Sequence, residues 1–243
     1  MITLRKNNKR HLLQHGSQET RRTFNPQEPR RAGPDGFGIL ITFDDIRLPP
    51  NGVSKIRALG GFEIITYIYK GALAQEDSAG SSGVVFAGEF QRLVIGSGIR
   101  HKERNALRSD FTHLFRISLH PTEVGLDSAH EQKHFTFGQR HNLLCAIAST
   151  DGRQKSLRIL QDAIFYSSIL DPGRHLAYEL SLGRSAWLHV INGEATMQDI
   201  ILTEGDGVGV TIEPVVSLTA TENTELLLID LGPGLRYGPE RKA

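Results

Sequence analysis

The chain has 243 residues and carries 28 Lys or Arg against 27 Asp or Glu, so it has no strong overall field for nucleic acid. Hydrophobic residues make up 39% of it, enough for a packed core, and no apolar run reaches the about 18 residues needed to cross a bilayer. The first residues lack the apolar core of a signal peptide. We therefore expect a cytoplasmic protein with no membrane contact.

Basic residues gather at the N-terminus. Residues 1–31 hold eight Lys or Arg against two Glu, a charge of +6, so the rest carries −5 of the total of +1. This arm could bind nucleic acid, or it could lie against the acidic remainder of its own chain. We expect the second arrangement, because the arm has no clustered aromatic residues for stacking on bases. The single cysteine, Cys145, excludes an internal disulfide and is expected to be a buried apolar filler.

Short apolar runs, separated by turn residues, recur along the chain at intervals of roughly ten residues, which is typical of antiparallel barrels and sandwiches. In the first half the predicted strands are Gly38–Phe43, Phe62–Lys70, Gly83–Phe86, Gln91–Ile95 and Leu114–Leu119. In the second half they are Leu143–Ala148, Leu157–Tyr166, His175–Leu180, Ala186–Ile191, Glu194–Met197, Gly207–Thr211 and Glu225–Leu231. The pair Asn192-Gly193 predicts a hairpin between two of them, since both residues tolerate positive φ.

The two halves of the sequence follow one pattern. Glu63–Lys70 is followed by Gly71 and later by Gly88-Glu89, while Trp187–Asn192 is followed by Gly193 and later by Gly205-Asp206. Duplication of one barrel explains this repetition. We place the boundary in the polar stretch Pro121–His134, which gives domains at 1–133 and 134–243.

These residues resemble the pirin family of bicupin proteins, which is also linked to quercetin 2,3-dioxygenase activity. The resemblance covers most of the chain, and its most specific segments are Gly88–Gln91 and Gly96–Glu103, which reads GSGIRHKE. It implies an all-β fold of two stacked double-stranded β-helix (jelly-roll) barrels with few short helices. It also implies a divalent metal such as iron in the N-terminal barrel, held by three histidines and one glutamate.

Two of the ligands that the resemblance implies are present, as His101 and Glu103. Residues two apart on a strand point to one face, so both can reach into the barrel mouth, where Glu103 would be the catalytic candidate. The other two would be histidines at positions 57 and 59, where this chain has Arg57 and Leu59. An imidazole and a carboxylate alone fall short of three facial ligands, so we expect no tightly bound metal cofactor.

Other side chains could take part in the pocket. We hypothesise that the Arg57 guanidinium lies near Glu103 and supplies the charge of the missing metal; the alternative is that it points outward at the rim. Glu63 and His113 are expected to line the pocket, Glu63 as a hydrogen-bonding partner of the site and His113 as a wall residue. His175 and His189 belong to the second barrel, where we expect surface or wall positions.

Two functions stay open. In the first, the chain is a ligand-binding, regulatory or interaction protein whose metal site is degenerate. Its partner would then be a small aromatic ligand or another protein, and not nucleic acid. In the second, it is a metal-dependent dioxygenase that opens a flavonol such as quercetin, with iron or another divalent ion completing the site. The incomplete ligand set favours the first function.

Overall fold

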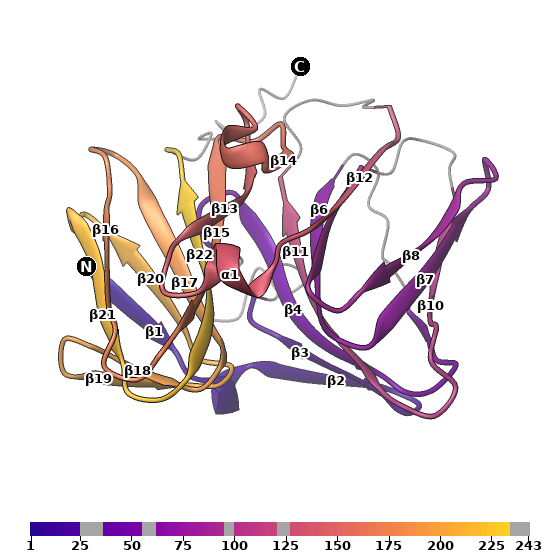
Figure 1. Ribbon diagram of the computed structural model, residues 1–243, viewed down its shortest axis with the longest axis horizontal. Coiled ribbons are helices and arrows are strands. Elements are labelled where there is room, and N and C mark those ends of the chain that lie inside the picture. The colour runs from indigo at the N-terminus through magenta and orange to yellow at the C-terminus, as the bar shows by residue number, and fades with distance from the viewer. Residues whose placement is uncertain (25–35, 55–61, 95–99, 121–126, 234–243) are drawn as a thin grey trace, which may run out of the picture.

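The computed structural model describes residues 1–24, 36–54, 62–94, 100–120 and 127–233. Its strands form two barrels side by side (Figure 1), which confirms the predicted all-β architecture. In these ranges helical structure is limited to η1 (Asn7–Lys9), α1 (Phe137–Arg140) and η2 (Arg153–Lys155), so none of it is long and apolar enough to span a membrane.

The N-terminal barrel combines a seven-stranded sheet, in the order β12-β9-β6-β11-β4-β3-β2, with a four-stranded sheet, β5-β10-β7-β8. Its strands are β2 (His11–His15), β3 (Gln18–Arg22), β4 (Leu40–Leu48), β5 (Val53–Ser54), β6 (Glu63–Lys70), β7 (Ala72–Asp77), β8 (Ser82–Phe86), β9 (Glu89–Val94), β10 (His101–Asn105), β11 (Thr112–Leu119) and β12 (Ala129–His134).

The C-terminal barrel repeats this plan, with sheets β1-β20-β17-β22-β15-β13-β14 and β16-β21-β18-β19. Its strands are β1 (Ile2–Arg5), β13 (Cys145–Ser149), β14 (Leu157–Arg158), β15 (Ala163–Leu170), β16 (His175–Glu179), β17 (Ser185–Asn192), β18 (Glu194–Met197), β19 (Ile200–Thr203), β20 (Gly207–Thr211), β21 (Val215–Ala220) and β22 (Thr224–Leu231).

A glycine corner connects the two sheets at the same point of each barrel. Gly71 joins β6 to β7 and Gly193 joins β17 to β18, both with φ of +88°. The predicted hairpin at Gly193 is therefore wrong, because β17 and β18 belong to different sheets. A buried threonine at the start of another strand, Thr112 of β11 or Thr224 of β22, fixes each corner. Its hydroxyl donates a hydrogen bond to the backbone carbonyl of the residue that follows the corner glycine.

One further prediction from the sequence is corrected. Leu157–Tyr166 is not one strand but divides into β14 and β15, which lie at different places in their sheet. The polar stretch chosen as the domain boundary contains strand β12, which pairs with β9 of the N-terminal barrel. Its side chains are mostly half-buried or exposed, so it has no run of apolar residues to mark it.

The main hydrophobic cluster lies between the barrels and draws on both of them. Trp187 of β17 stands at its centre, with its ring centroid 4.8 Å from that of Phe24 and 5.5 Å from that of Phe37. The indole lies so close to the backbone of β20 that a Cβ atom on Gly207 would come within 2.3 Å of its Cζ2 atom. Each barrel also has its own apolar interior, small in the first barrel and large in the second.

The N-terminal residues form a strap that joins the two barrels. β1 pairs with β20 of the C-terminal barrel, whereas β2 and β3 extend the large sheet of the N-terminal barrel. Residues 2–5 therefore lie outside the barrel to which we assigned residues 1–133.

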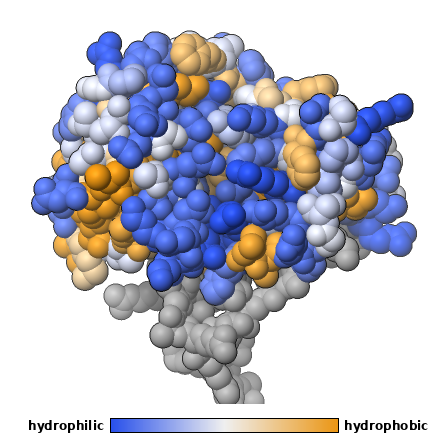
Figure 2. All heavy atoms as spheres, turned by 90° about the horizontal axis from the view of Figure 1, so that it is seen from below, coloured by the Kyte–Doolittle hydropathy of each residue, from blue (hydrophilic) through white to orange (hydrophobic). Residues whose placement is uncertain are grey.

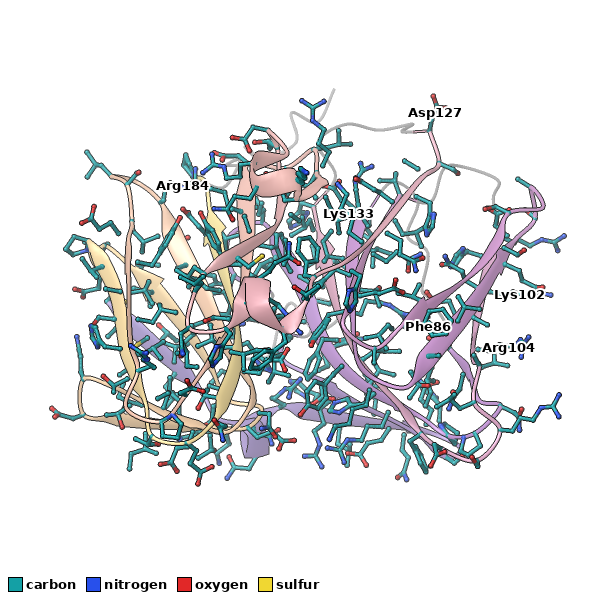
Figure 3. The ribbon with its side chains drawn as sticks, viewed as in Figure 1. Phe86, Lys102, Arg104, Asp127, Lys133 and Arg184 are labelled. Carbon is teal, nitrogen blue, oxygen red and sulfur yellow. The ribbon has the colours of Figure 1, made fainter. Side chains whose placement is uncertain are left out.

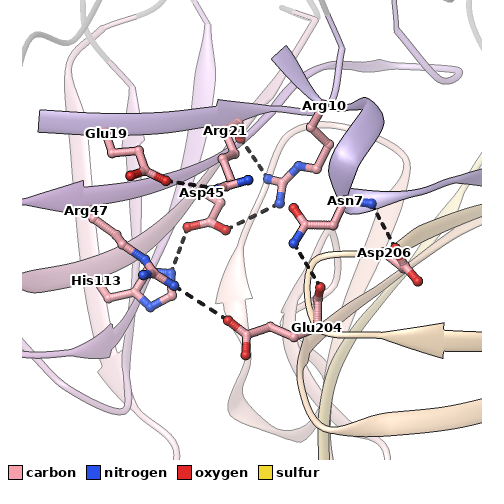
Figure 4. Close-up of polar contacts among 9 residues, drawn as sticks. All are labelled: Asn7, Arg10, Glu19, Arg21, Asp45, Arg47, His113, Glu204 and Asp206. Atoms are coloured by element: carbon pink, nitrogen blue, oxygen red, sulfur yellow. Dashed lines mark hydrogen bonds and ion pairs between the residues drawn. The ribbon is translucent and has the colours of Figure 1, made fainter. Parts of the chain in front are cut away.

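Acidic side chains anchor this strap, as we expected for the basic arm (Figure 4). Lys6 Nζ lies 2.8 Å from the buried carboxylate of Asp206. Figure 4 shows the buried guanidinium of Arg10, which lies 3.3 Å from the carboxylate of Asp45, and the backbone amide of Asn7, which donates to Asp206. Figure 2 shows the molecule from below the view of Figure 1. Hydrophilic residues dominate this face, and hydrophobic residues form separate groups on it.

Candidate functional site

The interiors of the two barrels differ in polarity at equivalent positions. Strand pairing and the corner glycines place six inward-facing positions of the first barrel in register with six of the second. The first barrel has Thr66, Gln75, Gln91, His101, Glu103 and Arg116. The second has Leu188, Met197, Val208, Val216, Leu218 and Leu228, all within its hydrophobic core. Only the first barrel therefore has a polar interior among the residues described, and it contains the candidate site.

His101 and Glu103 of β10 point into this interior, as their spacing predicted. Their side chains are 6% and 1% exposed, whereas the intervening Lys102 side chain is 74% exposed and points away from the barrel (Figure 3). The His101 Nε2 and Glu103 Oε1 atoms lie 3.5 Å apart. Both are buried, and apart from this mutual contact neither has a hydrogen-bond partner among the described residues. An imidazole nitrogen and a carboxylate oxygen, both able to bind a metal ion, thus face the same small space.

The second oxygen of Glu103 is occupied by a cation that the sequence did not lead us to expect. Arg116 of β11 donates a hydrogen bond from Nη2 to Glu103 Oε2, and its Nη1 donates to Ser54 Oγ at 3.2 Å. Both charged side chains are nearly inaccessible to water. In the sequence, this role of Arg116 is indicated by a single charged residue at an inward-facing position of the apolar strand Leu114–Leu119.

Arg116 also determines the ionisation of Glu103. Burial alone would raise the pKa of this carboxyl, but the charge of Arg116, together with His101, outweighs that effect and holds the pKa below its ordinary value. The folded protein therefore contains a buried carboxylate whose charge is already neutralised within the protein.

A chain of amides extends this polar interior toward β12. Gln91 Nε2 donates to Gln75 Oε1 at 2.5 Å, and Gln75 Nε2 lies 2.9 Å from His130 Nε2. The amide must be the donor here, so this imidazole nitrogen accepts. Burial, followed by the charge of His101, lowers the pKa of His130, which keeps the ring neutral as this geometry requires. These residues could bind polar groups of a ligand, and their separate places in the sequence had not marked them.

Glu63 and His113 lie elsewhere. The Glu63 carboxylate accepts from Arg92 Nε at 2.6 Å and from the backbone amide of Leu160 in the second barrel. His113 lies 2.7 Å from Asp45 and packs edge-on against Tyr69. Glu63 lies on the face of β6 opposite to Thr66, and His113 lies on the face of β11 opposite to Arg116. Both therefore take part in the contact between the barrels and do not join His101 and Glu103.

The two histidines of the second barrel are in different environments. His175 is exposed, within 3.0 Å of Thr219. His189 is fully buried between the barrels, and its ring centroid is 4.2 Å from that of Phe43. Neither of its ring nitrogens has a hydrogen-bond partner within the ranges that the structure describes. Burial, followed by the charge of Arg10, holds its pKa well below the ordinary value, so it is neutral.

The described residues supply an incomplete set of ligands for a metal ion in this interior. Arg57 and Leu59 lie outside the described residues, and so does the predicted contact between Arg57 and Glu103. The segment 55–61 reads KIRALGG and offers no histidine, cysteine or carboxylate. In the described part of the chain no group of three such side chains could hold an ion. His101 and Glu103 therefore supply two donors, one fewer than an open facial site requires.

Two barrels of this topology, only one with a polar interior, define a bicupin, and comparison with known proteins agrees. A family model described as "Pirin" matches residues 22–118, and one described as "Quercetinase C-terminal cupin domain" matches residues 146–231. Quercetin 2,3-dioxygenase of Escherichia coli strain K12 is 31% identical over 233 residues, which cover 96% of this chain and 100% of the relative. The chain belongs to the pirin family.

One further relative and two solved structures are also similar to this chain over most of its length. A pirin-like protein of Caulobacter vibrioides is 32% identical over 195 residues, covering 80% of this chain and 84% of that protein. The crystal structure of YhhW from Escherichia coli aligns with a TM-score of 0.87 at 30% identity, over 96% of this chain and 98% of that one. A structure of the bacterial pirin YhhW in complex with nickel(II) aligns with a TM-score of 0.85 at 30% identity, over 96% and 100%.

Proposed function

We propose that this protein is a non-catalytic pirin: a ligand-binding and regulatory bicupin in which the ion pair of Arg116 and Glu103 takes the place of a metal ion. A carboxylate at a metal site needs a positive charge beside it, because an isolated buried carboxylate is costly. Here the guanidinium provides that charge. This pair is the observation that carries the proposal.

The ligand that we propose is a small aromatic molecule with hydroxyl groups. Gln91 Oε1, Glu103 Oε1 and His101 Nε2 are buried atoms that find no hydrogen-bond partner in the described part of the chain, and such atoms are most stable when a polar group binds them. Carboxylate and amide oxygens accept hydrogen bonds from hydroxyl groups. We further propose that the protein acts in the reducing environment of the cytoplasm, consistent with its one free and buried cysteine.

A second candidate function is metal-dependent quercetin 2,3-dioxygenase activity. The unpaired His101 Nε2 and Glu103 Oε1 atoms favour it, since a separation of 3.5 Å suits two neighbouring ligands of one ion. The relative from Escherichia coli carries this name. A divalent ion would polarise a bound oxygen atom, and the described residues of this chain would contribute two ligand atoms and the polar wall.

One experiment separates the two functions. The protein is purified without chelators, its iron, nickel, copper, manganese and zinc are quantified, and quercetin absorbance is followed with and without each ion. The proposal predicts metal far below one ion per chain and no loss of quercetin. It also predicts saturable quenching of the Trp187 fluorescence or a titration heat on ligand binding. Metal near one ion per chain together with quercetin turnover would overturn it.

A further inference from the structure

The outer face of the small N-terminal sheet contains a groove, whose lining includes Gln75 and Glu103 of the polar interior together with the outward-facing residues beside them. It has a volume of about 370 Å³ and is lined by residues of β5, β7, β8 and β10. A second hollow of about 220 Å³ adjoins it and shares Glu76 and Lys102 with it. Together the two hollows follow β10 along the outside of the barrel, back to back with His101 and Glu103.

One side of this groove is a row of cations. Arg100, Lys102 and Arg104 occupy alternate positions, so they project from the same outer face at intervals of about 6.8 Å along the extended chain. Figure 3 shows Lys102 and Arg104 pointing outward from β10. All three residues are exposed.

These cations are available to a partner. In the part of the chain that the structure describes, neither Arg100 nor Arg104 forms an ion pair. Lys102 lies 3.7 Å from Glu76, but both side chains are more than half exposed. Such a pair contributes at most about 1 kcal/mol, so another carboxylate can displace Glu76 at little cost.

The floor and the opposite side of the groove are small and apolar at the end near Val53 and Val84, and polar at the other end, where Glu76 and Ser82 lie. Ala74 of β7 lies between the row of cations and Val84 of β8, and Val53, 61% exposed, lies at one end. Strands β10 and β8 are separated by one strand, so their rows stand about 9.5 Å apart. At the level of Arg104 and Val84 only the alanine side chain stands between the rows, and this width suits one extended peptide; at the level of Lys102 and Ser82 the side chain between them is Glu76.

We propose that this groove binds an acidic segment of a partner protein in extended conformation, with carboxylates alternating with small apolar side chains. Alternate residues of such a segment have the same spacing as the cations, so its carboxylates face Arg100, Lys102 and Arg104. Its apolar side chains then face Val84. Arginine clusters recognise acidic motifs in this way. A single-stranded nucleic acid fits less well, because bases need aromatic side chains to stack on and Phe86 is the one aromatic residue on the described outer face of these strands.

The proposal is tested with a fluorescein-labelled ten-residue peptide in which aspartate alternates with valine. Fluorescence anisotropy is expected to show saturable binding to the full chain, weakened by added salt. The double variant Lys102→Glu plus Arg104→Glu should lower affinity at least about tenfold, because two attractive contacts become repulsive. Both residues are exposed, so thermal unfolding should be unchanged.

The matched control makes the same change in charge on the other barrel, with Lys155→Glu plus Arg174→Glu, two exposed residues of the C-terminal barrel. It should retain wild-type affinity. A peptide with lysine in place of aspartate should not bind. Equal loss in both double variants would show non-specific attraction and overturn the proposal, as would the absence of saturable binding. Tighter binding of a ten-residue oligothymidylate would assign the groove to nucleic acid instead, and self-association abolished only by the groove variant would assign it to a second copy of the chain.

Discussion

Arg116 in the first barrel and Leu228 in the second occupy equivalent positions, each paired across the large sheet with an inward-facing residue, Thr66 or Leu188. The same relation holds for Glu103 and Leu218 on the small sheet. The second barrel thus shows that this architecture is stable with leucine at both places. The buried ion pair of the first barrel is therefore not required by the fold, which supports a role in binding.

The first prediction concerns the stability of this pair. Arg116→Met should lower the free energy of unfolding by about 3–5 kcal/mol, because it leaves the buried Glu103 carboxylate uncompensated. The double variant Glu103→Leu plus Arg116→Leu should recover most of that loss, since apolar residues of similar volume often replace a buried pair without cost. Urea unfolding at pH 7 measures both values. If the double variant is as unstable as the single one, a structural need for the pair is indicated.

A second prediction follows from the pKa of Glu103, which lies below its ordinary value in the folded protein. The carboxyl therefore contributes stability that is complete above the unfolded pKa of about 4.3 and is lost as pH falls through the lower folded value. The wild type should lose more stability than the Glu103→Leu plus Arg116→Leu variant between pH 7 and pH 3. Parallel stability curves for the two proteins would contradict the lowered pKa.

The third prediction tests the N-terminal strap through Asp206. Its buried carboxylate accepts hydrogen bonds from Lys6 Nζ at 2.8 Å and from the backbone amides of Asn7 and Thr203 at 2.8 and 3.0 Å. Asp206→Ala leaves these donors without their partner and should cost about 1–3 kcal/mol. Glu213→Ala, which removes only the exposed pair with the N-terminal amine, should cost less than about 1 kcal/mol. Similar losses in thermal unfolding experiments would show that the strap contributes little.

The fourth prediction tests the close contact of Trp187 with β20. Gly207→Ala would place a methyl group 2.3 Å from the indole and should destabilise the protein by about 1–3 kcal/mol or more. Trp187 is the only tryptophan, so its fluorescence reports both the local change and the unfolding midpoint. Gly138→Ala in α1, where a Cβ atom would meet nothing within 4 Å, is the control and should not lower stability. Unchanged fluorescence and stability in Gly207→Ala would mean that the contact is looser than described.

The sequence predicted the apolar strands well and the polar strands poorly. β6, β11, β17 and β22 are rich in β-branched or leucine residues because both of their faces are buried. Strand β12 is mostly polar, and periodicity gives little indication of such strands. The corner at Gly193 shows a further limit, since a turn signal cannot show whether the chain returns along the same sheet or crosses to another.

At the candidate site, the family resemblance identified His101 and Glu103, and their spacing predicted that both face the same interior, because alternation along a strand is a local property. Arg116 and Gln75 approach them through strand pairings between residues far apart in the sequence, and no local pattern encodes those pairings. The expectation that Glu63 and His113 line the pocket assigned the wrong face to each. Successive residues of a strand point to opposite faces, so an error of one residue moves a side chain to the wrong side of the sheet. The full set of site residues therefore cannot be predicted without knowing the register in which the strands pair.

The central claim is that the protein lacks a tight metal site, and a calorimetric titration of nickel(II) into the purified wild-type chain tests it most directly. We predict no saturable binding, whereas Arg57→His plus Leu59→His, which adds two imidazole donors, should gain binding near one ion per chain. Saturable, stoichiometric binding of nickel to the wild type that disappears in His101→Ala would contradict the account.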